Sequence, residues 1–345
     1  MKPLAERDLE HILDHTRDLW NEMRGERLFI TGGTGFFGRW LLESFLWINR
    51  KLTLGANATI LSRSPSAFFE KMPHLNGQPE LKWIAGDVTS FPHPEGSYAY
   101  VIHAATEASA KLTREDPGRM FDTIVGGTRR VLDFALSHGA QKFLLTSSGA
   151  VYGKQPADLP RVPEDFSGSP DPLDPMQVYG EGKRAAEMLC ALATKNFPCE
   201  MKIARCFAFV GPHLPLDAHF AIGNFIRDAM AGSAIVIKGD GTPQRSYLYA
   251  SDLAIWLWTI LFKGQSLRPY NVGSDQSLSI LETAKMVSGQ VNPPATIQVL
   301  GTPDPNRQLE RYVPDVSRAK SELALTQNVP LEQAIQFTME YCHDL

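Results

Sequence analysis

Short apolar runs alternate with longer amphipathic stretches through the first 206 residues of the chain. The amphipathic stretches, such as Arg119–Ser137 and Tyr179–Asn196, repeat apolar residues every three to four positions, which predicts helices. Strands that alternate with helices are typical of a parallel, doubly wound α/β sheet. Buried strands are expected at 28–31, 58–61, 81–85, 100–103, 142–146 and 201–205.

The pattern loosens beyond residue 206 and predicts a smaller second lobe over 207–345, with the chain crossing back to the sheet near 240–265. The sheet domain itself is expected to span 25–206. The helices and the strand expected in the second part are Phe220–Ala231, Ile235–Ile237, Asp252–Phe262 and Ser279–Ser288.

A helical extension is predicted at residues 1–24, docked on the body or on a second subunit, because apolar residues recur there at helical spacing. His11 and His15 lie one turn apart on it without a third ligand nearby, so no metal site is expected. The stretch Pro156–Pro175 contains six prolines and predicts a surface loop, either at the mouth of a site or as a plain connector. The apolar positions of the extension are Leu9, Ile12, Leu13, Trp20 and Met23.

Charge and composition narrow the classes of partner. The 345 residues carry a net charge of −4, so no basic field for nucleic acid or an anionic membrane is expected. Four scattered cysteines form no disulfide or zinc pattern, which favours a reducing compartment. No apolar run approaches the ~20 residues of a membrane span, and the N-terminus lacks a signal-peptide pattern, so a cytoplasmic location is expected.

The first strand opens directly into three glycines at positions 32, 35 and 38, followed by an apolar helix. The first glycine suits a tight turn, the second allows backbone to approach a pyrophosphate, and the third lets the helix pack close to the sheet. The helix N-terminus favours phosphate. This pattern predicts a Rossmann-type dinucleotide cradle. Its expected cofactor contacts are Gly32, Thr34, Gly35, Phe36, Phe37 and Gly38.

The end of the second strand discriminates between cofactors: an acid there binds the ribose of NAD, whereas an arginine accommodates the extra phosphate of NADP. Ser62 and Arg63 stand at this position with no acid, so the cofactor is expected to be NAD(P)(H) with NADP favoured. The alternative is a surface arginine stacked on the adenine of NAD. Later strand ends add the expected cofactor contacts Asp87, Val88, His103, Ala104 and Ala105, of which the histidine is expected to be a packed strand-end residue rather than a base.

A serine-rich strand end and a tyrosine–lysine pair carry the candidate chemistry. Tyr179 and Lys183 are four residues apart on a predicted helix and so share a face. The neighbouring ammonium is expected to lower the phenol pKa from about 10. With the Ser148 hydroxyl holding a substrate oxygen, Tyr179 could move the alcohol proton while hydride passes to or from a nicotinamide. These residues predict interconversion of an alcohol and a ketone.

Together these motifs resemble the extended short-chain dehydrogenase/reductase family, in its nucleotide-sugar epimerase/dehydratase branch. The resemblance covers nearly the whole chain and rests on the glycine cradle, Asp87-Val88, the Ser-Ser-x-x-Val-Tyr-Gly strand end and the Tyr-x-x-x-Lys helix. Later segments continue it: Arg205-Cys206-Phe207, Gly211-Pro212, Gly239 to Thr242, Arg245-Ser246-Tyr247, Ser251-Asp252, Asn271-Val272-Gly273 and Asp315.

The resemblance implies that Ser148, Tyr179 and Lys183 are catalytic, and that Lys183 also binds the nicotinamide ribose. It further implies a second lobe that holds a nucleoside diphosphate sugar, and a homodimer through the helices flanking Tyr179. The implied substrate contacts are Ser148, Asn224, Arg245 and a further cation from Arg307 or Arg311.

Departures from the family pattern reduce the number of reactions that the chain is expected to catalyse. The family's 4,6-dehydratases carry Asp and Glu directly after the catalytic hydroxyl, and its decarboxylases carry Glu at the second position, where this chain has Gly149 and Ala150. Dehydration and decarboxylation are therefore disfavoured. Ala208 also stands where the family has an asparagine that contacts the sugar diphosphate, and Gly182 replaces the serine before the lysine. A side-chain amide behind the site is missing at Ile124.

The leading hypothesis is a nucleotide-sugar 4-epimerase, and the close alternative is an NADPH-dependent reductase of 4-keto sugars. An epimerase should show no net turnover of cofactor, whereas a reductase should consume NADPH stoichiometrically. A non-catalytic NAD(P)-binding regulator and a reductase of carbonyl compounds without a nucleotide are the remaining alternatives.

Overall fold

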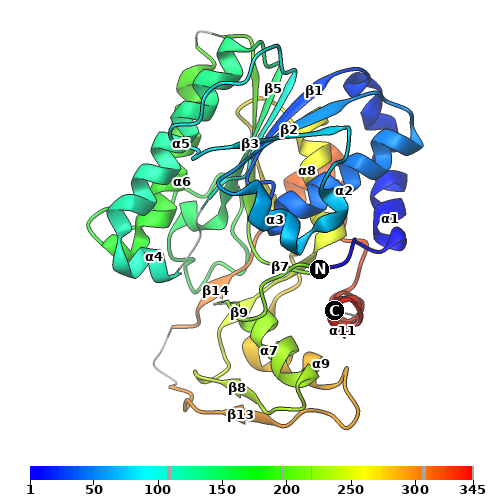
Figure 1. Cartoon of the computed structure of the whole chain (residues 1–345). Coiled ribbons are helices and arrows are strands. Elements are labelled where there is room, and N and C mark those ends of the chain that lie inside the picture. The colour runs from blue at the N-terminus through cyan, green and yellow to red at the C-terminus, as the bar shows by residue number, and fades with distance from the viewer. Residues whose placement is uncertain (107–109, 196, 219, 305–307, 344–345) are drawn as a thin grey trace. The chain divides into compact units, whose positions relative to one another are not determined.

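The structure is a computed structural model that describes residues 1–106, 110–195, 197–218, 220–304 and 308–343. Its largest sheet has seven strands in the order β11-β6-β5-β4-β1-β2-β3, and β1 to β6 pair in parallel (Figure 1). The expected doubly wound Rossmann-type sheet is confirmed. The strands are β1 (Arg27–Thr31), β2 (Asn57–Ser62), β3 (Leu81–Ala85), β4 (Tyr100–His103), β5 (Lys142–Ser148), β6 (Glu200–Cys206) and β11 (Pro269–Val272).

The strand order reverses between β1 and β4, which lie side by side although two strands separate them in the chain. Open parallel sheets bind ligands outside the carboxyl ends of their strands at such a reversal. The loop after β1 contains Gly32 and Gly35, Gly38 lies in the first turn of α2, and Ala104 follows β4. The topology therefore brings the predicted cradle to the switch point of the sheet.

Helices cover both faces of this sheet. On one face α5 and α6 pack against aromatic residues of the strands, with Phe29 of β1 lying 4.3 Å from Phe134 between ring centroids. The other face is covered by α2 and α8, with α1 packed outside α2 (Figure 1). The helical elements are α2 (Phe36–Lys51), α3 (Pro65–Lys71), η2 (Pro73–Leu75), α4 (Ala110–Glu115), α5 (Pro117–Ser137), η3 (Gly149–Tyr152), η4 (Pro175–Gln177), α6 (Val178–Ala193) and α8 (Ala250–Lys263).

The N-terminal extension packs on the sheet domain. It consists of α1 (Glu6–Thr16) followed by η1 (Arg17–Met23), so the extension is helical, but its second half is a 3-10 helix. Trp20 is fully buried, and its ring centroid lies 4.7 Å from that of Trp258. The indole of Trp20 packs closely against α8. This tertiary contact favours the tighter turns of a 3-10 helix in η1 over the α-helix that the apolar spacing predicts.

The chain divides into two compact units. The first contains 1–153, 169–206 and 254–270, and the second contains 154–168, 207–253 and 271–345. The second unit is built of short strands and helices. Its elements are β7 (Phe209–Val210), α7 (Ala221–Met230), β8 (Ile235–Ile237), β9 (Gln244–Arg245), β10 (Leu248–Tyr249), β12 (Leu278–Ser279), α9 (Ile280–Ser288), β13 (Ile297–Val299), β14 (Arg311–Tyr312), α10 (Ser317–Leu323) and α11 (Leu331–His343).

Part of the proline-rich stretch is more ordered than the expected surface loop. Val162 is buried and forms a parallel bridge with Pro314, within the second unit. The backbone N–H of Val162 donates to the carbonyl of Val313 at 2.9 Å, and the N–H of Asp315 donates back to Val162 at 2.9 Å. Proline blocks regular structure but leaves an intervening residue free to pair, which is why the composition alone was misleading.

Replacing Gly38 by alanine should destabilise the protein, because a Cβ at this position would lie 2.3 Å from the carbonyl oxygen of Gly32 and 2.3 Å from the Cα of Gly33. Both are backbone atoms that cannot turn away, so we expect a loss of about 1–3 kcal/mol and a lower thermal midpoint. Gly239→Ala is the matched control, since its Cβ would meet no atom within 4 Å. Equal thermal midpoints for the two variants would contradict this account of the cradle.

Candidate functional site

The loop after β1 is packed too closely to admit a side chain at Gly32. Gly32 has a φ of +75°, and a Cβ there would lie 2.4 Å from the backbone carbonyl carbon of Ala104. Gly35 is the N-cap of α2 and has no side chain that could cap the N–H groups of the first turn. Those N–H groups form the positive end of a 16-residue helix. The geometry of these glycines fits the pyrophosphate of a dinucleotide.

The end of β3 holds a carboxylate that is ionised at neutral pH. Asp87 Oδ1 accepts hydrogen bonds from the Thr89 hydroxyl at 2.6 Å and the Thr89 N–H at 2.9 Å. These bonds, with smaller contributions from the charges of Arg63 and Arg119, lower the pKa of Asp87. The structure therefore brings Arg63 and Asp87 into electrostatic range at neighbouring strand ends. Val88 packs against Gly127, where a Cβ would lie 2.9 Å from the valine Cγ1.

His103 at the end of β4 uses its ring inside the core. Its Nδ1 lies 2.8 Å from the Thr31 hydroxyl and its Nε2 lies 3.1 Å from the Thr128 hydroxyl. Burial lowers its pKa to about 3, so the ring is neutral. This placement agrees with a packed strand-end residue, and its contact with a cofactor stays a prediction. Ala104 and Ala105 follow it, and the Ala105 N–H donates to the Thr31 hydroxyl at 3.2 Å.

The three predicted catalytic residues come together in the first unit. Ser148 is the last residue of β5, and its hydroxyl lies close enough to the phenol of Tyr179, in the first turn of α6, to influence the pKa of that phenol. Lys183 lies one turn further along the helix, with its Nζ 5.9 Å from the centroid of the tyrosine ring. The Lys183 ammonium donates to the carbonyl of Thr146 at 2.7 Å and to the hydroxyl of Thr106 at 2.6 Å.

The expected direction of the tyrosine pKa is wrong for this structure. Burial raises the pKa of Tyr179 to about 12, and the nearby Ser148 hydroxyl opposes this rise without overcoming it. Burial also lowers the pKa of Lys183 to about 8. The reason is that the ammonium is directed at Thr146 and Thr106 rather than at the phenol oxygen. Tyr179 is therefore a neutral phenol at pH 7, suited to donate a proton.

Two residues near Lys183 were not predicted from the sequence. Thr106 follows β4 and accepts a hydrogen bond from the lysine, although it is 77 residues away in the chain. Glu187 lies one turn after Lys183 on α6 and binds Arg205 of β6 at 2.7 Å. Its spacing of four residues from Lys183 was a visible signal, but the partner on β6 depends on the register of the sheet.

The predicted substrate contacts lie in the second unit. Arg245 stands on β9, the middle strand of the sheet β12-β9-β14, with Tyr312 of β14 opposite it. Its guanidinium lies 4.0 Å from Glu310, and Arg311 on β14 donates to the carbonyl of Ala157. Asn224 lies on α7 and accepts from Arg227 at 3.3 Å. Arg307 lies outside the described residues.

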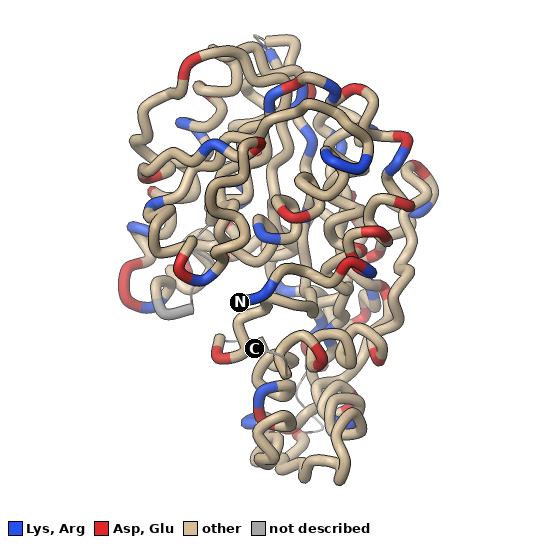
Figure 2. The backbone as a smooth tube through the Cα atoms, turned by 45° about the vertical axis from the view of Figure 1, so that its right-hand side comes forward, with Lys and Arg blue, Asp and Glu red and all other residues tan. Residues whose placement is uncertain are grey.

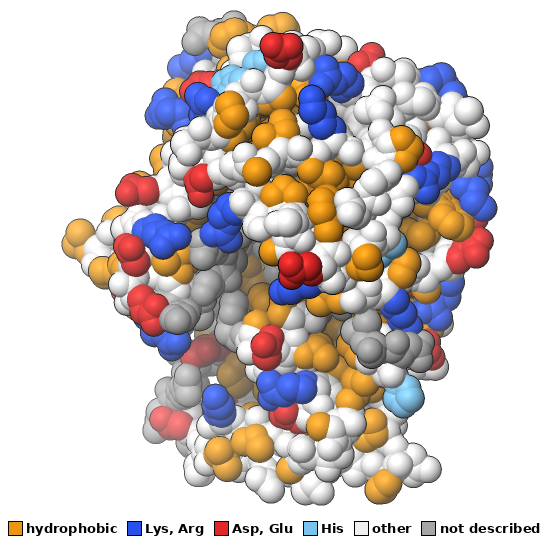
Figure 3. All heavy atoms as spheres, in the orientation of Figure 1, with side chains coloured by type: hydrophobic (Ala, Val, Ile, Leu, Met, Phe, Trp, Pro, Cys, Tyr) orange, Lys and Arg blue, Asp and Glu red, His pale blue; other side chains and the backbone are white. Residues whose placement is uncertain are grey.

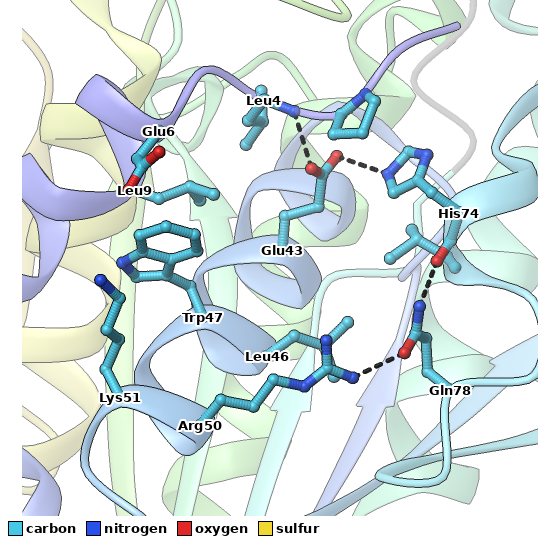
Figure 4. Close-up of a pocket in the computed structure, with 12 residues that line it drawn as sticks. Leu4, Glu6, Leu9, Glu43, Leu46, Trp47, Arg50, Lys51, His74 and Gln78 are labelled. Carbon is cyan, nitrogen blue, oxygen red and sulfur yellow. Dashed lines mark hydrogen bonds and ion pairs between the residues drawn. The ribbon is translucent and has the colours of Figure 1, made fainter.

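A pocket of about 520 Å³ lies elsewhere in the first unit, between the N-terminal segment, α2 and η2 (Figure 4). The carboxylate of Glu43 is buried there and accepts from the N–H of Leu4 at 2.7 Å, while His74 lies 3.3 Å from its other oxygen. The apolar side chains of Leu9, Leu46 and Trp47 also line the pocket, together with the polar ones of Glu6, Arg50, Lys51 and Gln78. These contacts tie the N-terminal segment to α2, and the lining contains none of the three catalytic candidates.

Charged residues of both signs are distributed along the described chain (Figure 2). On the face drawn in Figure 3, hydrophobic side chains lie between acidic and basic ones. Among the described residues there is no group of three or more His, Cys, Asp or Glu that could hold a metal ion. Of the helices that the structure describes, none combines the length and the apolar character that a bilayer crossing requires.

The cradle at the switch point and the serine–tyrosine–lysine arrangement define a dinucleotide-dependent enzyme class, and sequence comparison identifies it. Residues 28–273 match the sequence model of the NAD dependent epimerase/dehydratase family. That match covers the strands of the large sheet, the predicted cofactor contacts and the three predicted catalytic residues. The chain belongs to this family, whose members are NAD-dependent enzymes, and the resemblance inferred from its motifs is confirmed.

Curated relatives extend the similarity over most of the chain. UDP-glucuronic acid decarboxylase 3 of Arabidopsis thaliana is 31% identical over 315 residues, which cover 91% of this chain and 88% of the relative. UDP-glucuronic acid decarboxylase 1 of Danio rerio is 30% identical over 325 residues, which cover 93% of this chain and 73% of the relative.

Solved structures show the same fold at lower identity. UDP-glucose 4-epimerase of Thermotoga maritima, solved with UDP-glucose, superposes with a TM-score of 0.76 at 20% identity and covers 92% of this chain and 99% of its own. UDP-glucuronic acid 4-epimerase of Bacillus cereus, in complex with UDP-glucuronic acid and NAD, gives a TM-score of 0.76 at 22% identity, with the same coverage of 92% and 99%. At this level of identity the structures establish the fold alone.

Proposed function

We propose that the protein is an NAD(P)-dependent oxidoreductase that acts at C4 of a nucleoside diphosphate sugar, of the 4-epimerase type. The observation that supports this best is the placement of the Tyr179 phenol beside the Ser148 hydroxyl, with Lys183 one turn away on the same helix and held by Thr146 and Thr106. The names of the curated relatives and of the solved epimerases support a nucleotide-sugar substrate.

In this proposal Ser148 holds the C4 oxygen and Tyr179 moves its proton. A bound oxidised nicotinamide supplies the hydride acceptor and a positive charge. With the dinucleotide bound, its positive charge and that of Lys183 would favour the phenolate of Tyr179, which would take the hydroxyl proton while the C4 hydrogen leaves as hydride to give a 4-ketone. Return of the hydride to the opposite face of the C4 carbonyl, with the tyrosine proton going back to the C4 oxygen, would invert C4. The glycine cradle, with Ser62, Arg63 and Asp87, holds the dinucleotide, and Lys183 binds its nicotinamide ribose.

Decarboxylation and dehydration need groups that this chain lacks beside the catalytic hydroxyl. Gly149 and Ala150 start η3 directly after Ser148 and carry no carboxylate. The proposed reaction therefore differs from the decarboxylation that the names of the curated relatives give.

We propose that the diphosphate is held by Arg245, Asn224, Arg311 and Arg307.

A reductase of 4-keto sugars is the second candidate, and the neutral phenol favours it. With its pKa raised to about 12, Tyr179 is set to donate a proton to a carbonyl oxygen. Incubation of the wild-type protein with UDP-, dTDP-, GDP- and CDP-sugars separates the reactions. Inversion at C4 seen by NMR, with no net change in cofactor absorbance, supports the epimerase, and stoichiometric loss of NADPH with a keto sugar supports the reductase. Release of CO₂ from UDP-glucuronate would overturn both.

Tyr179→Phe should reduce turnover by about 10²–10⁴-fold, because the variant cannot move the C4 proton. Tyr100→Phe is the matched control: Tyr100 begins β4 and its hydroxyl donates to the carbonyl of Glu22 at 3.0 Å. The Tyr100→Phe variant loses a hydrogen bond at the amino ends of the strands, opposite the site, and should keep the wild-type turnover. Initial rates with the substrate found in the panel measure both. Full activity of Tyr179→Phe would refute the assigned role.

NADP is the cofactor that Arg63 favours in this proposal, although NAD is the cofactor bound in the B. cereus structure. Arg63→Ala should weaken NADP binding at least tenfold and leave NAD binding within about twofold, since only NADP carries the extra phosphate for the guanidinium. Titration calorimetry with each dinucleotide measures the ratio. An equal loss for both would instead identify an arginine stacked on adenine.

A homodimer through α5 and α6 is part of the same proposal. Phe121 of α5 is 38% exposed, and Met188 and Leu192 of α6 are 60% and 48% exposed, with the last two one turn apart. Replacing Met188 and Leu192 together by glutamate should convert a dimer into a monomer, because it puts charge into an apolar contact. Sedimentation velocity measures the mass. Leu300→Glu, at a 65% exposed site in the second unit, is the control. A wild-type monomer would rule the dimer out.

A further inference from the structure

The carboxylate of Glu187 is shared between two strands next to the catalytic residues. Its Oε1 accepts from the Ser147 hydroxyl of β5 at 2.5 Å and from the Arg205 Nε of β6 at 3.0 Å. Its Oε2 accepts from a terminal nitrogen of the same guanidinium at 2.7 Å. Such a bidentate arginine–carboxylate pair is both strong and geometrically specific.

Arg205 carries the network on to η3. A terminal nitrogen of its guanidinium donates to the Tyr152 hydroxyl at 2.9 Å, and the guanidinium carbon lies 4.8 Å from the centroid of that ring. The side chains of Arg205 and Glu187 are 15% and 14% exposed, so the pair is largely withdrawn from water. Removing one partner would leave the other charge buried and unpaired.

The network connects α6 and β5, the two elements that carry the catalytic residues. Tyr179, Lys183 and Glu187 follow at intervals of four residues and share one face of α6. Ser147, which pairs in register with Arg205, directly precedes Ser148 on β5. Holding Glu187 therefore sets the rotation of α6 against the end of β5, and with it the approach of the Tyr179 phenol to the Ser148 hydroxyl.

The same carboxylate acts on the charge of Lys183. Burial lowers the pKa of Lys183, while the negative charge of Glu187 raises it and so keeps the ammonium protonated to higher pH. The other titratable groups that face or influence this lysine are Tyr179 and Cys190 of α6, Cys206 of β6 and His103 of β4. Of these groups Glu187 is the one that is negatively charged at neutral pH.

We propose that Glu187 is a positioning residue for the reaction at C4: it locks α6, which carries Tyr179 and Lys183, to β5 and β6. The inference builds on the proposed function, because it assigns a role within that same site. Glu187 itself touches neither the reacting atoms nor the cofactor in this scheme. It acts through Lys183 and through the strand that ends in Ser148.

Glu187→Gln tests the proposal, since glutamine keeps the shape and an acceptor for Ser147 but removes the charge. We expect kcat to fall about ten- to hundredfold with KM nearly unchanged, because a misplaced catalytic group slows the chemical step more than it weakens binding. The alkaline limb of the pH–rate profile should move to lower pH, since Lys183 then loses its proton more easily. An unchanged kcat and pH profile would overturn the proposal.

Glu80→Gln is the matched control within the same unit. Glu80 accepts from Arg50 at 2.7 and 2.8 Å in a bidentate pair on the surface, so the variant breaks a similar pair away from the site. Its kcat and pH profile should equal those of the wild type. If Glu187→Gln and Glu80→Gln behave alike, Glu187 has no positioning role.

A paired variant separates positioning from simple stabilisation. Glu187→Met with Arg205→Met replaces the ion pair by apolar side chains, which often preserve or restore stability. We expect its thermal midpoint to return toward that of the wild type while kcat stays low. Recovery of kcat together with stability would show that the pair is only structural.

The titration of Lys183 gives a readout that needs no substrate. NMR of the lysine side chains in wild-type, Glu187→Gln and Glu80→Gln proteins follows its pKa, which should fall only in Glu187→Gln. If the wild-type protein turns over no nucleotide sugar, the proposed function fails while this titration still decides whether Glu187 supports the charge of Lys183. An unchanged Lys183 pKa in Glu187→Gln would overturn the electrostatic part.

Discussion

The site depends on how the chain satisfies one buried ammonium. Lys183 is almost fully buried, and a buried charge is tolerated only where hydrogen-bond acceptors surround it. Its acceptors are the carbonyl of Thr146 near the end of β5 and the hydroxyl of Thr106 after β4. The N-terminal half of α6 must therefore lie against the carboxyl ends of these strands. Tyr179, one turn earlier, is carried to Ser148 as a consequence.

The opposite requirement, the absence of side chains, governs the neighbouring cradle. Gly32 and Gly38 let the loop after β1, the start of α2 and the backbone of Ala104 approach within distances that no Cβ would allow. The first turn of α2 is thereby aimed across the switch point between β1 and β4. A positive helix end and a set of proton-handling groups thus meet at one edge of the sheet, as a dinucleotide-dependent reaction requires.

Several motifs noted in the sequence have structural roles in the second unit. Asp252 accepts hydrogen bonds from the N–H groups of Asn328 and Val329 at 2.9 and 3.0 Å. The Asn271 amide donates to the carbonyl of Val162 at 2.8 Å and to that of Asp315 at 2.9 Å. These side chains hold segments without regular structure in place, because they satisfy backbone groups that no strand or helix pairs. Family resemblance could flag such positions, but it could not tell a structural role from a binding one.

The sequence by itself determined the alternation of strands and helices, the glycine cradle and the spacing of Tyr179 and Lys183, because these depend on local periodicity and on glycine's lack of a side chain. Only the tertiary structure decided the protonation of Tyr179, the partners of Lys183 and the link from Glu187 to Ser147 and Arg205. These depend on burial and on the register of β5 against β6, which join residues far apart in the chain. A spacing of four residues places two side chains on one face of a helix, but it cannot say which atoms that face meets.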